Sequence, residues 1–368
     1  MLKIYLPIIL LIVTSSLLAQ NSKINTINQR PTKQWEQVEP SFDTKDIDSL
    51  TSLIMHHKDP SIRKRAGELL GLAINKGVKT SEKTIADLVN AWEKEKDGEA
   101  RASILNALAS INRRHKDNRI QALAIKAFRS SPSTDWDKVT AIQIIDYFGG
   151  NKAIELELIQ IIATNPSEIF IKGHSDNERI PLLWTQLQAA NCLGTMKSQK
   201  AVTPLFKSLT NLIKNEDISL KKTFANEASF YEMYYYTYSG VLAKIGGENV
   251  ISLCLSFIDD ESKEIRYIGA KILGKIGDSR AVPILCEILG KSTNSDEKVL
   301  AIYYLEDMKD KRAIPALKEA LKDKNTSRRD RLNRPVALAA YHALIKFDIK
   351  VEVKYPKEGE PPVYRVLE

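Results

Sequence analysis

The chain has 368 residues, 43% of them hydrophobic, with a formal net charge of +8 and a pI near 9.1. This hydrophobic content is enough to bury a core, and it excludes an aperiodic, disordered chain. The mild excess of basic residues does not imply a nucleic-acid partner, because exported and membrane-adjacent proteins are often this basic.

Residues 1–19 have the pattern of a secretory signal peptide. Lys3 provides a short basic region, residues 4–13 are mostly apolar, and small residues then lead to Ala19. The apolar run is short for a membrane-spanning helix, which needs about 20 residues. We therefore expect cleavage after Ala19 and a location in the periplasm or outside the cell. The alternative is a retained N-terminal anchor, which would bring the chain to a membrane.

Residues 20–43 are rich in Asn, Gln, Lys and Pro, and we expect them to form a flexible linker. The folded part follows and contains an internal repeat. The segment 274–285 reappears 32 residues later as 306–317, with the same spacing of aspartate, Arg-Ala, an aliphatic residue, proline and leucine. Within the first copy, Gly277 is expected to end one helix and Asp278 to cap the next. A fixed period of this length is typical of a stacked array of helix pairs.

These segments resemble HEAT repeats, in the variety also found in phycobilin lyases. The resemblance is best over 259–289 and 291–322, and it covers most of 45–347 with decreasing quality. It implies a right-handed α-solenoid of about eight antiparallel helix pairs over residues 44–348. The motif specifies a helix pair and no particular activity.

Three cysteines are present, at positions 192, 254 and 286. Cys254 and Cys286 are 32 residues apart and so occupy one position in successive repeats. Neighbouring helices are about 8–10 Å apart, whereas a disulfide needs Cα atoms within about 7 Å. We therefore expect small buried hydrophobic residues and no disulfide.

The segment 230–238 contains five of the thirteen tyrosines. In a helix, Tyr231, Tyr234, Tyr235 and Tyr238 lie on one broad face together with Phe230. Tyrosine is favoured at interfaces because it combines a large apolar body with a polar tip. The face is thus a candidate partner-binding surface, and the alternative is that its rings fill a gap where the superhelix changes register.

A second candidate contact is a basic run before the last helix, which we expect to start near Pro335. Its arginines are Arg328, Arg329, Arg331 and Arg334. Such a run can recognise acidic groups on a protein, a glycan or a phospholipid. The alternative is a solvated loop between helices.

Residues 349–368 differ from the repeats. Apolar and charged residues alternate from Ile349 to Tyr355, a Gly- and Pro-containing turn follows, and 363–367 can return as a second strand. We expect a small β extension that caps the terminal repeat.

No catalytic, phosphate-binding or metal-binding motif occurs in the sequence, so we expect no enzymatic activity, no metal and no cofactor. The favoured function is a non-enzymatic scaffold for protein–protein interaction, exported to the periplasm or cell exterior. One alternative is a tetrapyrrole-handling protein similar to the phycobilin lyases. A nucleic-acid-binding solenoid is less favoured because the signal segment argues against it, so the expected partner is a protein.

Overall fold

The computed structural model describes residues 46–130, 135–164, 176–214, 230–325, 334–356 and 360–367. The expected signal peptide at 1–19 and linker at 20–43 lie outside these ranges. The chain divides into two compact units, with the boundary between His115 and Lys116. None of the described helices is both long and apolar enough to span a membrane.

The first unit consists, in its described part, of two stacked helix pairs. Its helices are α3 (Ile47–His56), α4 (Pro60–Asn75), α5 (Glu82–Lys94) and α6 (Gly98–Asn112). Helix α3 packs against α5, and α4 packs closely against α6. Gly67 makes this close approach possible, because a Cβ atom at that position would lie 2.4 Å from the Ser103 hydroxyl oxygen.

The second unit is a stack of helix pairs in two layers. The first layer contains α8 (Asp135–Tyr147), α11 (Asp176–Thr195), α14 (Phe230–Ile245), α16 (Lys263–Ile276), α18 (Ser295–Met308) and α20 (Pro335–Lys346). The second layer contains α7 (Asn118–Arg129), α9 (Glu155–Ala163), α12 (Val202–Lys214), α15 (Glu248–Ile258), α17 (Val282–Lys291) and α19 (Ile314–Ala320).

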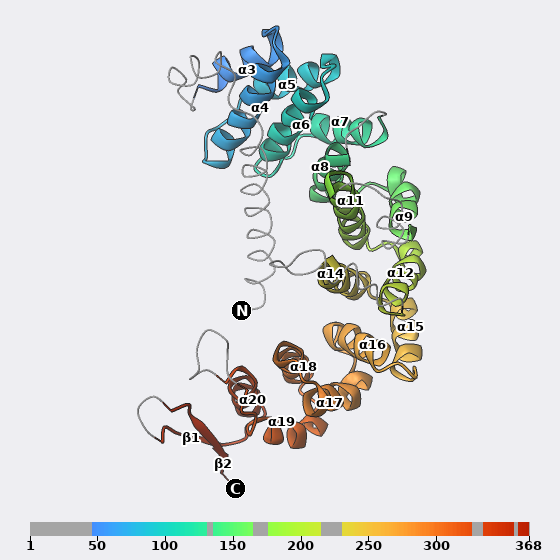
Figure 1. The fold of residues 1–368 in the computed structure, drawn as a ribbon, viewed down its shortest axis with the longest axis vertical. Helices are drawn as coiled ribbons and strands as arrows, with labels where there is room; N and C mark the ends of the chain where they lie inside the picture. The colour runs from blue at the N-terminus through green and yellow to red at the C-terminus, as the bar shows by residue number, and fades with distance from the viewer. Residues whose placement is uncertain are drawn as a thin grey trace. The chain divides into compact units, whose positions relative to one another are not determined.

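Within the first layer each helix packs against the next one, and each also packs against a partner in the second layer. In Figure 1, α14, α16, α18 and α20 line the inner side of this unit. Six pairs here and two in the first unit give eight pairs among the described residues. The predicted all-α solenoid is therefore confirmed.

The repeated turn has the predicted local chemistry. Helix α16 ends at Ile276, and Gly277 follows in the left-handed conformation with φ of 90°. Asp278 then caps a short 3-10 turn, accepting a hydrogen bond of 3.0 Å from the Arg280 backbone N–H. The second copy repeats this arrangement, with Lys309 at φ of 51° in place of the glycine. A left-handed lysine is less favourable than a glycine, so the two turns are equivalent in geometry but not in conformational cost.

Arginines at matched repeat positions hold helix ends. The Arg63 Nη1 atom donates to the carbonyls of His57 and Lys58, and its Nε and Nη2 atoms donate to the Glu95 carboxylate at 2.6 and 2.8 Å. Arg266 likewise donates to two carbonyls, those five and six residues before it. Both side chains thus satisfy backbone carbonyls of the loop that joins the two helices of a pair.

The C-terminal extension is the expected hairpin. Strands β1 (Val351–Lys354) and β2 (Val363–Val366) pair antiparallel, with Val353 opposite Tyr364. The Tyr364 ring packs against Tyr341 of α20, with ring centroids 5.2 Å apart. The hairpin therefore covers part of the last helix, as predicted for a cap.

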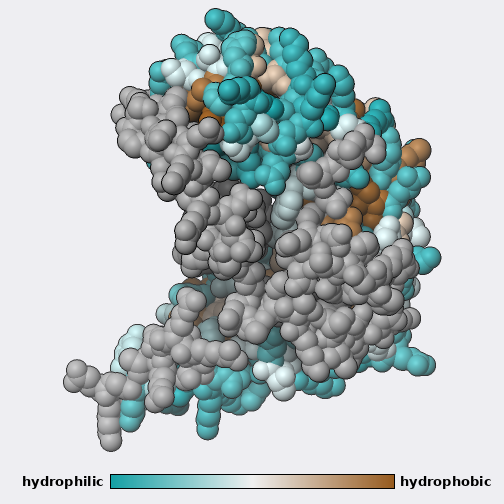
Figure 2. Space-filling model, turned by 45° about the horizontal axis from the view of Figure 1, so that its top comes forward, coloured by the Kyte–Doolittle hydropathy of each residue, from teal (hydrophilic) through white to brown (hydrophobic). Residues whose placement is uncertain are grey.

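The cysteines are free thiols. Cys192 and Cys254 are buried as expected, whereas Cys286 is half-buried. In the view of Figure 2 most of the described surface is hydrophilic, and hydrophobic residues appear as small patches. Apolar exposure alone therefore does not locate a binding site on this face.

Candidate interaction surface

The predicted tyrosine face is divided between the core and the surface. Tyr234 and Tyr238 are 0% and 1% exposed, so they belong to the core and cannot contact a partner in the folded chain. The prediction that these two residues contact a partner is therefore wrong, because the side of α14 that carries them packs against α11, α12 and α16. Tyr235 is half-buried. The side chain of Tyr231 lies outside the described part.

Tyr234 instead belongs to a buried polar network. Its hydroxyl donates to Gln186 Oε1 and lies 3.2 Å from the Leu183 carbonyl oxygen, both on α11. The Gln186 side-chain amide donates in turn to the carbonyls of Ile161 and Thr164, at 3.1 and 2.8 Å. The network thus connects α14, α11 and the C-terminal end of α9. Burial raises the pKa of Tyr234 well above its usual value and keeps the hydroxyl protonated.

Two exposed aromatic residues lie on helices α14 and α18 of the first layer. Tyr236 on α14 is 54% exposed, and Tyr303 on α18 is 38% exposed. The ring of Tyr235 stands edge-on to that of Tyr236, with centroids 5.3 Å apart. Helix α16 lies between α14 and α18 and contributes two lysines. We call this region the tyrosine–lysine face; its exposed members are Tyr236, Lys275 and Tyr303, and its buried or half-buried members are Tyr235, Lys271 and Tyr304.

A glycine brings the two tyrosine pairs together. A Cβ atom at Gly274 of α16 would lie 2.9 Å from the Tyr304 ring, so only glycine lets this ring lie directly on α16. Burial raises the pKa of Tyr304, and the nearby hydroxyls of Tyr235 and Tyr236 raise it further. The hydroxyls of α14 and α18 are therefore close enough to interact electrostatically across α16.

Lys271 is a structural cation. Its side chain is 7% exposed, and its ammonium donates at 2.8 Å both to Glu297 Oε1 and to the Tyr235 hydroxyl. Burial alone would raise the pKa of the Glu297 carboxyl, but the hydrogen bond and charge of Lys271 lower it below its usual value. The charge of Lys271 is thus neutralised within the protein and fixes the position of Tyr235.

Lys275, one helical turn further along α16, is different. The residue is exposed, and burial of its ammonium among neighbouring groups lowers the pKa of Lys275. The ammonium lies 3.2 Å from where a Cβ atom of Gly240 would be. In the described part of the chain no side chain forms an ion pair or hydrogen bond with it. Lys275 is therefore a cation available to a ligand.

The predicted basic run is mostly outside the described residues, which include Arg334 but not Arg328, Arg329 or Arg331. Arg334 is half-buried and directly precedes α20. Its Nε atom is buried without a hydrogen-bond partner in the described part, and its charge lowers the pKa of Tyr364 on β2, which burial raises. Arg334 is thus positioned against the C-terminal hairpin.

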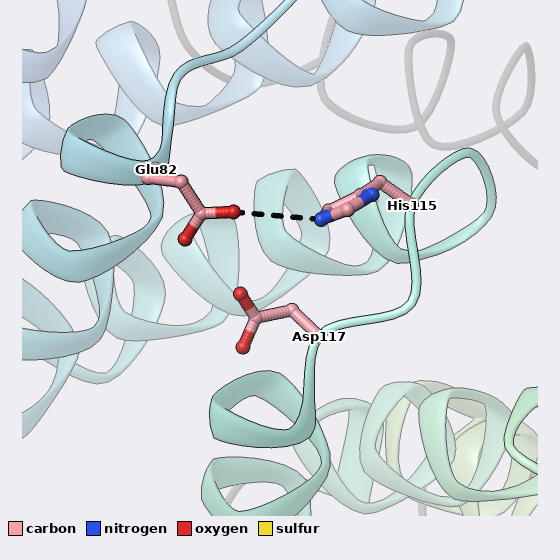
Figure 3. Close-up of side chains that lie close together, drawn as sticks. All are labelled: Glu82, His115 and Asp117. Carbon is pink, nitrogen blue, oxygen red and sulfur yellow. Dashed lines mark ion pairs between the residues drawn. The ribbon is translucent and has the colours of Figure 1, made fainter.

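In the first unit, Glu82 and His115 face one another (Figure 3). The His115 Nε2 atom lies 3.6 Å from Glu82 Oε1, and the two side chains are 63% and 71% exposed. Asp117, also drawn there, belongs to the second unit, where it caps α7 and pairs with Arg119. The Glu82–His115 contact is exposed to solvent on both sides, and exposed contacts of this kind contribute little to stability.

Sequence reasoning missed Tyr303, Tyr304, Lys271 and Lys275. The 32-residue period contained a signal for two of them, because Lys271 and Tyr303 occupy the same position in successive repeats. Equivalent positions of a stacked array lie side by side on one face. Their exposure depends on the neighbouring helices, which the period does not describe.

Comparison with known proteins supports the repeat assignment. A family model described as HEAT repeats matches residues 236–303 and 258–345, which contain the tyrosine–lysine face except Tyr235. No curated protein matches the sequence.

Solved structures with related folds are distant. The complex of CpcE and CpcF of phycocyanin lyase from Nostoc sp. PCC7120 is 13% identical, with 82% of this chain and 93% of that chain covered and a TM-score of 0.39. Human deoxyhypusine hydroxylase is 15% identical, with 83% and 96% covered and a TM-score of 0.29. Kap121p bound to RanGTP is 12% identical, with 87% and 43% covered and a TM-score of 0.36.

Similarities at these identities and TM-scores say nothing about activity or partners. The match to the HEAT family model and the observed stack of helix pairs do not depend on these distant structures. The prediction of a HEAT-repeat protein is confirmed, and residues 236–345 are the part of the chain that the HEAT family model covers.

Proposed function

We propose that this chain is a non-enzymatic scaffold that holds a segment of a protein partner on its tyrosine–lysine face. One observation carries the proposal: Tyr236 and Tyr303 are exposed on helices α14 and α18, and Lys275 of the intervening helix α16, whose ammonium lies against Gly240 of α14, has no partner among the described residues. Exposed tyrosines and a charged side chain supply both contact area and orientation for a partner. No feature of the described residues supports the tetrapyrrole-handling alternative.

Site-specific photo-crosslinking tests this proposal. A benzoylphenylalanine residue replaces Tyr303 in the full chain, and a matched control replaces Lys318, which is exposed on the outer helix α19. We expect a discrete crosslinked protein product from position 303 and none from position 318 when irradiation is done in the producing cells. Equal crosslinking from both positions would contradict a binding role for the inner layer.

Export is a separate part of the proposal and is supported only by the order of basic, apolar and small residues in 1–19. Sequencing of the N-terminus of the mature protein is expected to begin at or near Gln20. An intact chain that begins with Met1 and fractionates with the cytosol would refute export without affecting the binding proposal.

A further inference from the structure

The C-terminal hairpin has an unpaired strand edge. Among the described residues its sheet has two strands, and Figure 1 shows it beyond α20 at the C-terminal end of the second unit. The Leu367 backbone N–H donates at 2.9 Å to the carbonyl of Lys350, the residue directly opposite. Hydrogen-bonded and non-hydrogen-bonded pairs alternate along an antiparallel ladder, so the N–H and C=O groups of Val351 and Val353 point away from β2. No described residue hydrogen-bonds these groups, and this edge of β1 can therefore accept another strand.

The charges of β1 are complementary to a second copy of the same strand. Glu352 and Lys354 lie on one face of the hairpin, where their side chains form an ion pair of 3.2 Å. A lysine on an edge strand discourages pairing with another chain unless an acidic group faces it. When a second β1 runs antiparallel about a two-fold axis at Val353, each Glu352 lies opposite Lys354 of the other copy. Two opposite-charge pairs then flank the central valines, and such pairs stabilise a sheet.

Neighbouring registers of the same two strands are less favourable. Pairing centred on Glu352 or on Lys354 places that residue opposite its own copy, so that like charges face each other. Pairing centred on Val351 would need the backbone N–H of Ile349 to bond the second copy. That N–H already donates at 3.0 Å to a carbonyl of α20. Charge and backbone geometry therefore both favour the register centred on Val353.

The same register covers an exposed aromatic side chain. Tyr355 directly follows β1 and is 75% exposed. It would lie opposite Val351 of the second copy, on the face of the hairpin where Val353 is paired with Tyr364. Pairs of an aromatic and a β-branched residue stabilise antiparallel sheets, and a sheet of more than two strands is more stable than an isolated hairpin.

We infer that β1 is a dimerisation strand, and that two copies of the chain join their hairpins into one antiparallel sheet of order β2-β1-β1-β2. Glu352 of each copy faces Lys354 of the other in this sheet. The contact uses the same surface on both copies and is therefore closed after two. It is separate from the tyrosine–lysine face and does not rest on the proposed function. One short strand per copy buries little area, so the association is expected to be weak and reversible.

Sedimentation velocity of the full chain at increasing concentration tests the inference, with a monomer–dimer equilibrium as the expected result. Val353→Pro removes the outward N–H at the centre of the contact and no hydrogen bond within the hairpin. We expect it to weaken dimerisation at least about tenfold. Val366→Pro is the matched control, because it removes the outward N–H of β2 at the opposite edge of the hairpin. It should leave dimerisation unchanged.

Two charge variants test the register. Glu352→Lys makes the edge of β1 entirely positive, and Lys354→Glu makes it entirely negative. Each variant alone is expected to dimerise about tenfold more weakly, because like charges then face each other. An equimolar mixture of the two variants restores both opposite-charge pairs and is expected to form heterodimers as tight as the parent dimer. Recovery on mixing also shows that both variants keep a folded hairpin.

Three results would overturn the inference. The first is a chain that stays monomeric at every concentration, or a dimer that Val353→Pro leaves intact. The second is association that grows beyond two copies, which a closed two-fold contact forbids. The third is loss of dimers in Val353→Pro without recovery in the mixture of charge variants, because the register would then be wrong. None of these results changes the crosslinking expected from position 303, so the proposed function is tested separately.

Discussion

Two tyrosines of α14, one helical turn apart, allow a matched test of the buried network. Tyr234→Phe removes the hydroxyl that donates to Gln186 Oε1 and leaves that buried acceptor without its donor. The amide nitrogen of Gln186 stays bound to the carbonyls at the end of α9, so the side chain cannot turn away to find another partner. An unsatisfied buried polar group costs about 1–3 kcal/mol, and we expect a loss of unfolding free energy in this range.

Tyr238→Phe removes the same group from a residue that is equally buried. Its hydroxyl has no hydrogen-bond partner in the described part of the chain, so the tyrosine already carries the desolvation cost. Deleting this hydroxyl is expected to change the unfolding free energy by less than about 0.5 kcal/mol, or to stabilise the chain slightly. The two variants lose the same atom, so their difference isolates the hydrogen bond.

Urea unfolding followed by circular dichroism measures this difference through the midpoints at constant slope. Tyr234→Phe should have the clearly lower midpoint, with Tyr238→Phe close to the parent. Equal midpoints would refute the reasoning, because the Tyr234–Gln186 hydrogen bond would then contribute nothing. A larger loss for Tyr238→Phe would show that its hydroxyl has a partner outside the described residues.

Three further predictions concern the packing between repeats. Cys254→Ala should lower the unfolding free energy by about 1 kcal/mol, and a reducing agent should leave the melting temperature of the parent unchanged because the thiols are free. Arg63→Ala should cost about 1–3 kcal/mol, because it leaves the Glu95 carboxylate, whose side chain is 4% exposed, without its cation. Burial raises the pKa of Glu95, but the hydrogen bonds and charge of Arg63 outweigh this effect and lower the pKa below its usual value of 4.5. The stabilisation by the Arg63–Glu95 pair should therefore be complete above that pH and disappear as the pH falls through the lowered pKa. Gly274→Ala should cost about 1–3 kcal/mol and weaken binding at the tyrosine–lysine face, since its methyl group displaces the Tyr304 ring; unchanged unfolding and binding would contradict this contact.

Local patterns predicted the helices, turns and hairpin because their causes are local. The left-handed Gly277, the capping Asp278 and the alternation before Tyr355 act within a few residues of the chain. The number of helix pairs could be predicted because each copy of a repeat with a fixed period indicates one helix pair. These features were predictable without any knowledge of how the copies pack.

The surface could not be predicted in the same way. Helical spacing placed Tyr234, Tyr235 and Tyr238 on one side of α14, but spacing does not say which sides are covered. Helices α11, α12 and α16 cover the stripe of Tyr234 and Tyr238 and leave Tyr236 exposed. Such coverage is a property of three other segments of the chain.

The repeat itself separates structure from function. Residues that stay the same between copies have the same structural role. Asp278 forms an ion pair with Arg280, and Asp310 forms the equivalent ion pair with Arg312 in the next copy. Other equivalent positions differ between copies: on the first helix of each pair, Lys271 is replaced by Tyr303 one repeat later, and Lys275 is replaced by Asp307. Because equivalent positions lie side by side in a stack, these differences create a surface in which cation, ring and carboxylate alternate at the spacing of neighbouring helices. The selectivity of the array is therefore expected to reside in its departures from the repeat, and the most direct of these is Lys275, which has no ion-pair partner in the part of the chain that the structure describes.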